Sequence, residues 1–321
     1  AIAACDLAEV IGSALALQLL FGIPILAGIV ITILDVFLIL YFQNKGFKVI
    51  ESIVLSLLIV IICCFAYELF ISQPSIAGIV GGLIPQTSVV MNPSQLYVAI
   101  GILGATVMPH NLYLHSSIVQ TRAIKDTDED KEKAIKYATW DSTISLGFAF
   151  FINAGILILA AAAFHGNNLK LVADIRDAYQ LLDPVLGSKL ASILFAVALL
   201  ASGQNATLTG TLAGQIVMEG FLDLRIAPWL RRLITRLIAI IPAFFITWIY
   251  GESKIGELLV FSQVVLSMQL SFAVIPLVWF TSDANRMGKF VNPVWMTWLA
   301  WIVSAIILSL NCYLLGQIFF A

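Results

Sequence analysis

The sequence predicts an all-α polytopic membrane protein, and three observations support this fold class. Hydrophobic residues make up 60% of the 321 residues and charged residues only 11%, whereas a soluble domain carries roughly 25% charged residues. The apolar residues gather in runs of about 20, the length that an α-helix needs to cross a bilayer. Lysine and arginine are concentrated in alternate connections between these runs, as they are in membrane proteins.

Nine membrane-crossing segments are predicted from these runs. They cover residues 2–20, 25–42, 49–71, 95–122, 137–164, 185–219, 231–250, 257–280 and 294–320. The connection 72–94, rich in proline and glycine, is predicted to be an ordered external loop, and the loop 165–184 to hold a short surface helix. The mixed charges of residues 125–136 are interpreted as a solvated linker.

The distribution of positive charge predicts the orientation of the chain. Of the 17 lysine and arginine residues, 13 lie in the connections at 45–48, 122–136, 225–236 and 286–289. Short loops rich in positive charge stay cytoplasmic. We therefore expect a multi-pass protein of the cell membrane, with the first span starting in the cytoplasm and the C-terminus outside the cell.

The fourth span is predicted to be broken at mid-membrane. Pro109 has no backbone N–H and its ring clashes with the carbonyl four residues earlier, while Gly101 and Gly104 lower the helix propensity just upstream. A break in hydrocarbon is tolerated where it is buried or lines a wet cavity, and secondary transporters place ion and substrate sites at such breaks. Two hypotheses stay open: a kink packed against neighbouring helices, or a binding site.

Three neutral groups are candidate metal ligands. The Met108 thioether is a soft ligand that favours transition metals over calcium and magnesium. The carbonyl of Ala105 is available if the segment is unwound, and Gln263 in the eighth span offers an amide oxygen. Alternatively, the methionine side chain only fills space in the packing between helices, and the glutamine amide makes hydrogen bonds between helices. No carboxylate that would neutralise a divalent cation is evident near Met108.

Charged residues within the spans are candidates for proton transfer. Asp6 and Glu9 are three residues apart and share one helix face; they form either a proton relay or a solvated pair at the membrane boundary. Arg236 lies about one turn inside the seventh span and needs a carboxylate partner, for which Asp6 or Glu9 is predicted. Asp35 and Asp141 are single acids that serve either as hydrogen-bond anchors or in function.

Two histidines follow the predicted break. His110 and His115 are five residues apart and so do not share one helix face. Histidine changes its charge near physiological pH, which suits a proton carrier. A hydrogen-bonded interior residue is the alternative for each of them.

Several segments resemble the signatures of the Nramp family of proton-coupled manganese and iron transporters. They are Asp-Leu-Ala-Glu-Val-Ile-Gly-Ser at 6–13, Met-Pro-His-Asn-Leu-Tyr-Leu-His-Ser at 108–116, Arg-Leu-Ile-Thr-Arg at 232–236 and Ser-Gln-Val-Val-Leu-Ser at 262–267. The resemblance covers essentially the whole chain. It implies one transmembrane domain, 1–321, with a leucine-transporter-like inverted-repeat fold that corresponds to family helices 3 to 11.

The resemblance also implies roles for single residues. The Asp-Pro-Gly-Asn motif of the family's first broken helix does not occur in this sequence, so we expect the first two helices to be missing and the chain alone not to transport. The implied metal ligands are Ala105, Met108 and Gln263, and the implied proton-pathway residues are Asp6, Glu9, His110, His115 and Arg236.

The expected function is secondary active transport of divalent transition-metal ions, such as manganese and iron, coupled to protons by alternating access. The expected partners are metal ions, protons and the lipid bilayer, with no resident cofactor, no nucleic acid and no obligate protein partner. A proton- or sodium-coupled amino-acid symporter of the same fold is the main alternative, and it would not need Met108. A channel is a further alternative. An enzyme is not expected, because a ligand set such as H-E-x-x-H is absent from the sequence.

Overall fold

The computed structural model describes residues 2–35, 37, 41, 47–84, 86–120, 124–165, 174–222 and 228–320. Within these ranges the ordered structure is helical and contains no strand. Seven of the described helices are long and apolar enough to cross a membrane. The all-α membrane fold class is therefore confirmed.

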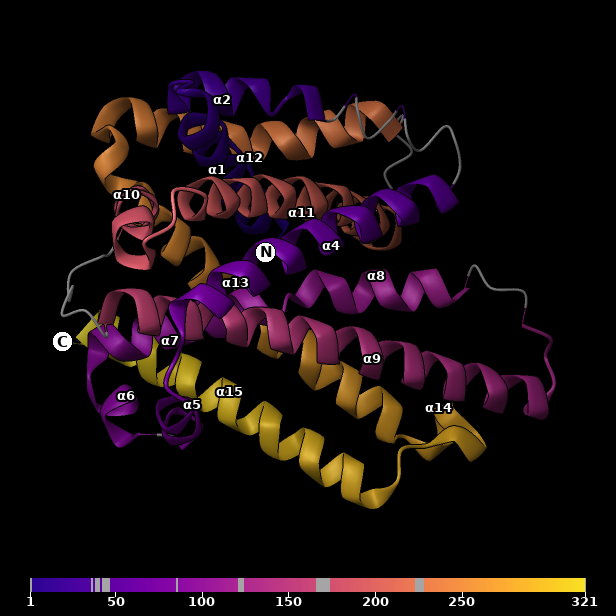
Figure 1. Ribbon diagram of the computed structural model, residues 1–321. Helices are drawn as coiled ribbons and strands as arrows, with labels where there is room; N and C mark the ends of the chain where they lie inside the picture. The colour runs from indigo at the N-terminus through magenta and orange to yellow at the C-terminus, as the bar shows by residue number, and fades with distance from the viewer. Residues whose placement is uncertain are drawn as a thin grey trace. The chain divides into compact units, whose positions relative to one another are not determined.

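Figure 1 shows the described helices in the order in which they follow along the chain. Their bounds are α1 Ile2–Phe21, α2 Ile25–Ile31, α4 Phe47–Ser72, α5 Ile76–Gly82, α6 Thr87–Met91, α7 Pro93–Thr106, α8 Pro109–Gln120, α9 Asp128–Ala160 with a π-helical end η1 Ala161–His165, α10 Ile175–Leu186, α11 Ala191–Leu222, α12 Pro228–Tyr250, η2 Glu252–Lys254, α13 Ile255–Ser282, α14 Ala284–Met287, η3 Gly288–Phe290 and α15 Val294–Phe320.

Seven of the predicted spans coincide with the seven membrane-length helices, with α7 and α8 together forming the fourth. The predicted span 231–250 lies within α12, whose apolar stretch runs from Arg236 to Tyr250. The predicted span 25–42 begins with α2, and several of its later residues lie outside the described ranges.

The loop 72–94, predicted to be ordered, contains the short helices α5 and α6. Two details of the predicted organisation are wrong. The charged linker is mostly helix, because α9 already begins at Asp128, where acidic residues interact favourably with the helix dipole and where lysine and glutamate favour helix. The sixth span starts later than predicted, since α10 ends before Gly187, whose left-handed φ of 65° terminates that helix. The short surface helix expected in 165–184 is confirmed as α10.

The chain forms two compact units. The first unit comprises Gln86–Ser145 and Val260–Ala321, and the second comprises Ile2–Pro85 and Leu146–Leu259. In the first unit α7 packs against α13 and α15 around a small apolar core. This core consists of Leu96, Ile100, Val264 and Leu314.

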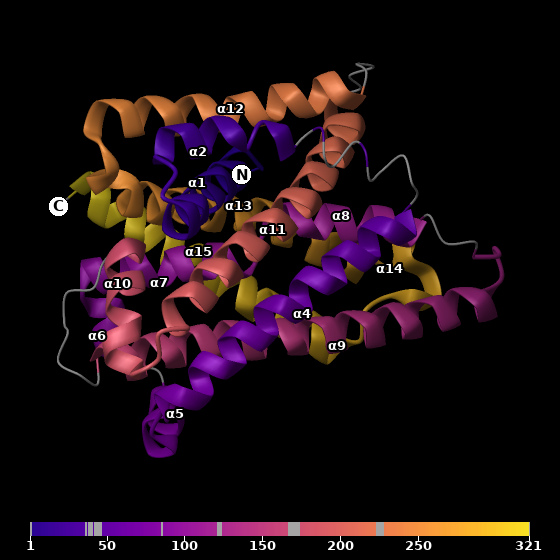
Figure 2. The same ribbon diagram turned by 45° about the horizontal axis from the view of Figure 1, so that its top comes forward.

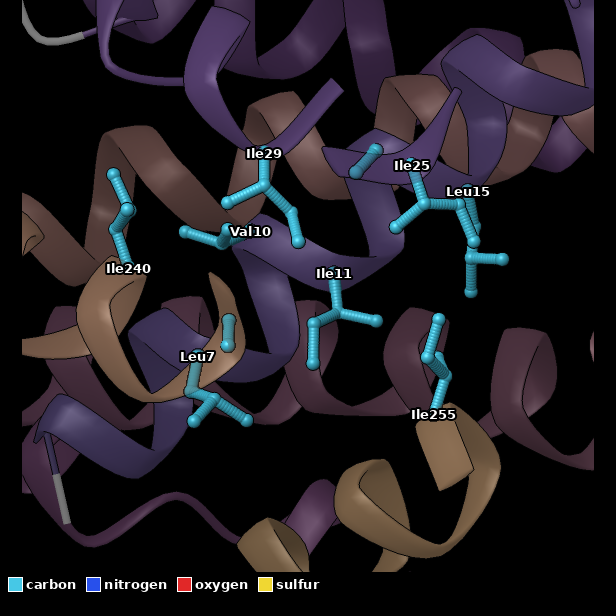
Figure 3. Packing of buried hydrophobic residues seen from close by; sticks show 10 residues of the cluster. Leu7, Val10, Ile11, Leu15, Ile25, Ile29, Ile240 and Ile255 are labelled. Carbon is cyan, nitrogen blue, oxygen red and sulfur yellow. The ribbon is translucent and has the colours of Figure 1, made fainter. Parts of the chain in front are cut away.

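The core of the second unit surrounds α1, which lies beside α2, α11 and α12 (Figure 2). Side chains of α1 point toward α2, α12 and the start of α13 (Figure 3). The labelled residues of this core are Leu7, Val10, Ile11, Leu15, Ile25, Ile29, Ile240 and Ile255. Burying this apolar surface holds α1 in the middle of the unit.

Small residues let the neighbouring helices approach α1 closely. A Cβ atom on Gly28 of α2 would lie 3.0 Å from the Cα atom of Ala14, and one on Gly203 of α11 would overlap the hydroxyl of Ser13. Glycine and alanine at such crossings bring helix backbones together in membranes. The polar residues of α1 are therefore held directly against α11.

Candidate metal and proton sites

The fourth span is broken at the predicted place. Helix α7 ends at Thr106 and α8 begins at Pro109. Between them Val107 adopts φ −110° and ψ 84°, outside the helical region, while its N–H still donates to the carbonyl of Leu103 at 2.9 Å. Pro109 explains the break, because it lacks an N–H and fits the first turn of a new helix.

The break leaves the carbonyl of Ala105 without its usual helical partner. In an α-helix this carbonyl would accept from the N–H of residue 109, and that residue is proline. The carbonyl of Met108 in turn accepts from the N–H of Asn111 at 3.1 Å, which starts α8. Both predicted ligands lie in or next to the break, because α7 ends at Thr106 and α8 begins at Pro109. Ala105 is exposed and Met108 is half-buried.

Helix α13 lies directly against the turn of α7 that precedes the break. The backbone of Gly104 is so close that an added Cβ would overlap the carbonyl oxygen of Gln263 and lie 2.7 Å from the backbone nitrogen of Ser267. The side-chain Nε2 of Gln263 donates to the hydroxyl of Ser262 at 3.0 Å. Its Oε1 atom is the end of the amide that can accept a hydrogen bond or bind a cation.

A residue that sequence reasoning missed fixes this part of α13. Asn311 of α15 accepts from the hydroxyl of Ser267 at 3.2 Å and donates to the Ser267 carbonyl, also at 3.2 Å. Both side chains are buried. The only signal that the sequence offers for Asn311 is an amide side chain within the apolar run of the last span.

In the second unit, three of the predicted proton-pathway residues come together. Asp6, Glu9 and Arg236 are each less than 7% exposed. The Nη1 atom of Arg236 lies 3.5 Å from Oε2 of Glu9, one of its two predicted partners. The Nη2 atom lies 3.6 Å from Oδ2 of Asp35, so this single acid of the second predicted span is the other partner of the guanidinium.

Helix α11 supplies polar partners that sequence reasoning did not identify. Gln204 donates to Asp35 at 3.1 Å, and Thr207 accepts from Arg236 at 3.3 Å. A Cβ atom on Gly210 would lie 2.8 Å from Oε1 of Glu9, so glycine makes room for this carboxylate. Their spacing of three residues puts them on one helix face, and this spacing is the signal that could have revealed them.

The charges of this network are not balanced by the arginine alone. One guanidinium faces the carboxylates of Glu9 and Asp35, and Asp6 lies beside Glu9 on the same face of α1. Unbalanced charge is costly in a buried site. Proton binding is the chemistry that can complete the balance here, and it makes the network suited to proton transfer.

The two histidines both fall on α8. The side chain of His110 lies outside the described residues, although its backbone belongs to the first turn of the helix. His115 lies one turn further along the same helix and is exposed. The structure therefore places both histidines after the break, and their proposed roles stay predictions.

Comparisons with known proteins complete these observations. A family model described as natural resistance-associated macrophage protein-like matches residues 1–317. A divalent metal cation transporter MntH of Listeria monocytogenes is 62% identical over 315 residues, which cover 98% of this chain and 70% of the relative. An MntH of Xanthomonas campestris is 59% identical over 317 residues, covering 99% of this chain and 71% of the relative. The crystal structure of the Eremococcus coleocola manganese transporter matches with a TM-score of 0.85 and 41% identity, covering 97% of this chain and 68% of that one.

Proposed function

The chain belongs to the natural resistance-associated macrophage protein (Nramp) family of divalent metal cation transporters, and from this premise we propose proton-coupled transport of manganese, iron and related ions by alternating access. Its fold is the leucine-transporter-like fold of that family. The relatives named above are metal cation transporters and not enzymes. This favours metal transport over the amino-acid alternative.

The observation that carries the proposal is the chemistry of the break between α7 and α8. Three features support it: Met108 lies between α7 and α8, the Ala105 carbonyl lacks the N–H that a helix would offer because residue 109 is proline, and Gly104 contacts the backbone of Gln263 on α13. One sulfur and neutral oxygens favour transition metals over calcium and magnesium. We propose that Ala105, Met108 and Gln263 contribute ligands to the transported ion.

Proton coupling is assigned to the buried network of the second unit. Glu9 and Asp35 flank Arg236, and Asp6 adds a further carboxyl on the same helix as Glu9. Proton binding or release by these groups changes the charge balance around one guanidinium, which gives a physical link between protonation and helix packing. We assign the route to Asp6, Glu9 and Arg236, with His110 and His115 as further carriers.

We further propose that the protein lies in the cell membrane with its first span starting in the cytoplasm and its C-terminus outside. The uneven distribution of lysine and arginine supports this orientation. Labelling of single cysteines placed in the loops, from either side of intact cells, tests it.

Uptake into proteoliposomes that contain the protein in the form its own cell makes tests the function itself. Saturable Mn²⁺ uptake, inhibited by Fe²⁺ and Cd²⁺ but not by Ca²⁺ and accompanied by internal acidification, is the expected result. Non-saturating uptake would indicate a channel. Uptake of radiolabelled amino acids without Mn²⁺ uptake would indicate the symporter alternative.

A further inference from the structure

Helix α4 carries an acidic side chain that has no place in the network described above. Glu68 lies one turn before the C-terminal end of α4 and is 0% exposed. Neither oxygen of its carboxyl group has a hydrogen-bond partner among the described residues. Buried polar groups nearly always find partners, so two unpaired oxygens on one carboxyl group require an explanation.

The described surroundings of Glu68 provide no cation. Helix α4 packs mainly against α11 and also meets α10 (Figures 1 and 2). The first charged residue of α11 is Glu219, near its far end. On α10, Arg176 pairs with Glu252 and Asp177 is exposed. The other titratable group of this face is Cys64, one turn earlier on α4.

The neighbouring polar groups are engaged with one another. The hydroxyl groups of Tyr67 and Ser188 lie 3.4 Å apart, which joins this turn of α4 to the segment preceding α11. Asp183 of α10 accepts from the backbone N–H of Ser192 at 2.9 Å. Asp183 therefore has a partner at the start of α11, whereas Glu68 has none among the described residues.

An unpaired carboxylate in such a place costs several kcal/mol, and the group neutralises instead. A metal ion would need several ligands, and within the described part of the chain no group of three histidine, cysteine or acidic side chains is close enough to hold one. A single carboxyl group suffices for a proton. The proton is therefore the ligand that fits this site.

We propose that Glu68 is a second proton-binding site, separate from the network at Arg236, whose occupancy depends on conformation. The carboxyl group holds a proton while α4 and α11 enclose it, and it releases that proton to water when the same packing opens. This proposal rests on the proposed transport function in one respect: the change between alternating conformations is what opens the packing of α4 against α11.

The pH dependence of transport tests the site. Glu68→Gln resembles the protonated side chain, and Glu51→Gln replaces an exposed acid of the same helix as a matched control. We expect Mn²⁺ uptake by the unaltered protein and by Glu51→Gln to fall severalfold as the pH of the medium rises, while uptake by Glu68→Gln falls less steeply, because only the network at Arg236 then responds to pH. A Glu68→Gln profile that follows the unaltered protein would overturn the proposal.

An infrared measurement keeps the proposal testable if Glu68→Gln does not transport, or if the protein proves not to carry metal. The carbonyl band of a protonated carboxylic acid is compared between the unaltered protein and each variant in neutral detergent solution. Loss of one such component in Glu68→Gln, but not in Glu51→Gln, is expected. Identical bands in all three proteins would show that Glu68 is ionised and would refute the proton site without bearing on metal transport.

Discussion

Gly104 of α7 and Gln263 of α13 lie in direct backbone contact within the first unit, one turn before the helix break. This contact has no room for a side chain, because a Cβ at Gly104 would overlap the Gln263 carbonyl. The Asn311 hydrogen bonds fix the next turn of α13 at Ser267. The position of the break relative to Gln263 is thus set by backbone packing and does not depend on a flexible contact.

Gly104→Ala should therefore impair the site more than a substitution elsewhere in α7. We expect a destabilisation of about 1–3 kcal/mol from overpacking, together with weaker metal uptake. Gly101→Ala is the matched control, since its Cβ would make ordinary contacts, at 3.4 Å with the Val260 side chain and at 3.7 Å with the Val260 carbonyl oxygen and the Val264 side chain. Melting temperature in detergent and uptake normalised to protein amount measure the two effects. Equal behaviour of the two variants would contradict the packing argument.

Arg236→Ala should be among the most damaging substitutions in the second unit. It leaves the buried Glu9 and the partly buried Asp35 without their arginine partner, and breaking a buried pair costs about 3–5 kcal/mol. Arg236→Lys keeps the charge but not the two-pronged geometry, so we expect an intermediate loss. Melting temperatures of both variants are compared at neutral and acidic pH.

Acidification should restore part of the stability lost by Arg236→Ala, because protons then neutralise the two carboxylates. The same acidification should help Arg236→Lys less. If Arg236→Ala melted at the temperature of the unaltered protein at neutral pH, the ion pairs would contribute nothing measurable, and their role in proton coupling would have to be abandoned.

The sequence predicts the features that depend on local chemistry and misses those that depend on contacts between distant segments. The break follows from Pro109, one residue whose backbone cannot continue a helix, and it is found where expected. Arg236 and Asp35 are 201 positions apart in the sequence, and no local pattern predicts that they pair. Helix packing alone reveals that Gly210 makes room for Glu9.

Local patterns also mislead where two principles compete. The charges around Asp128 indicate a solvated segment, and they are indeed exposed, but the same residue types favour helix and begin α9 there. Glu68 shows the opposite failure. It is one acid in an apolar run without a recognisable motif, and only its complete burial, with no partner in the described part of the chain, draws attention to it.

Asp6→Asn should separate proton flux from metal flux. Asparagine keeps the size of the side chain but cannot carry a proton, and Asp6 is buried beside Glu9 on α1. We expect Mn²⁺ uptake to continue at a reduced rate while internal acidification falls to the background level. Asp177→Asn, an exposed acid of α10, is the control and should leave both fluxes unchanged. Unaltered acidification in Asp6→Asn would remove Asp6 from the route.

Met108→Ala should change the selectivity of transport and not merely its rate. Removing the thioether leaves only oxygen ligands in the proposed set, and oxygen ligands favour calcium and magnesium relative to softer ions. We expect the apparent affinity for Mn²⁺ or Cd²⁺ to fall about tenfold, equivalent to about 1.4 kcal/mol of binding free energy. Uptake of Ca²⁺ should rise in the same preparation.

The matched control is Met296→Ala, which removes an exposed methionine of α15. It should leave both the affinity and the preference for Mn²⁺ over Ca²⁺ unchanged, because its thioether is far along the chain from the break and does not belong to the proposed ligand set. Metal binding by calorimetry separates a lost ligand from slower transport. Unchanged affinity and preference in Met108→Ala would mean that the sulfur only fills space at the break, and the proposed ligand set would then lose its one soft member.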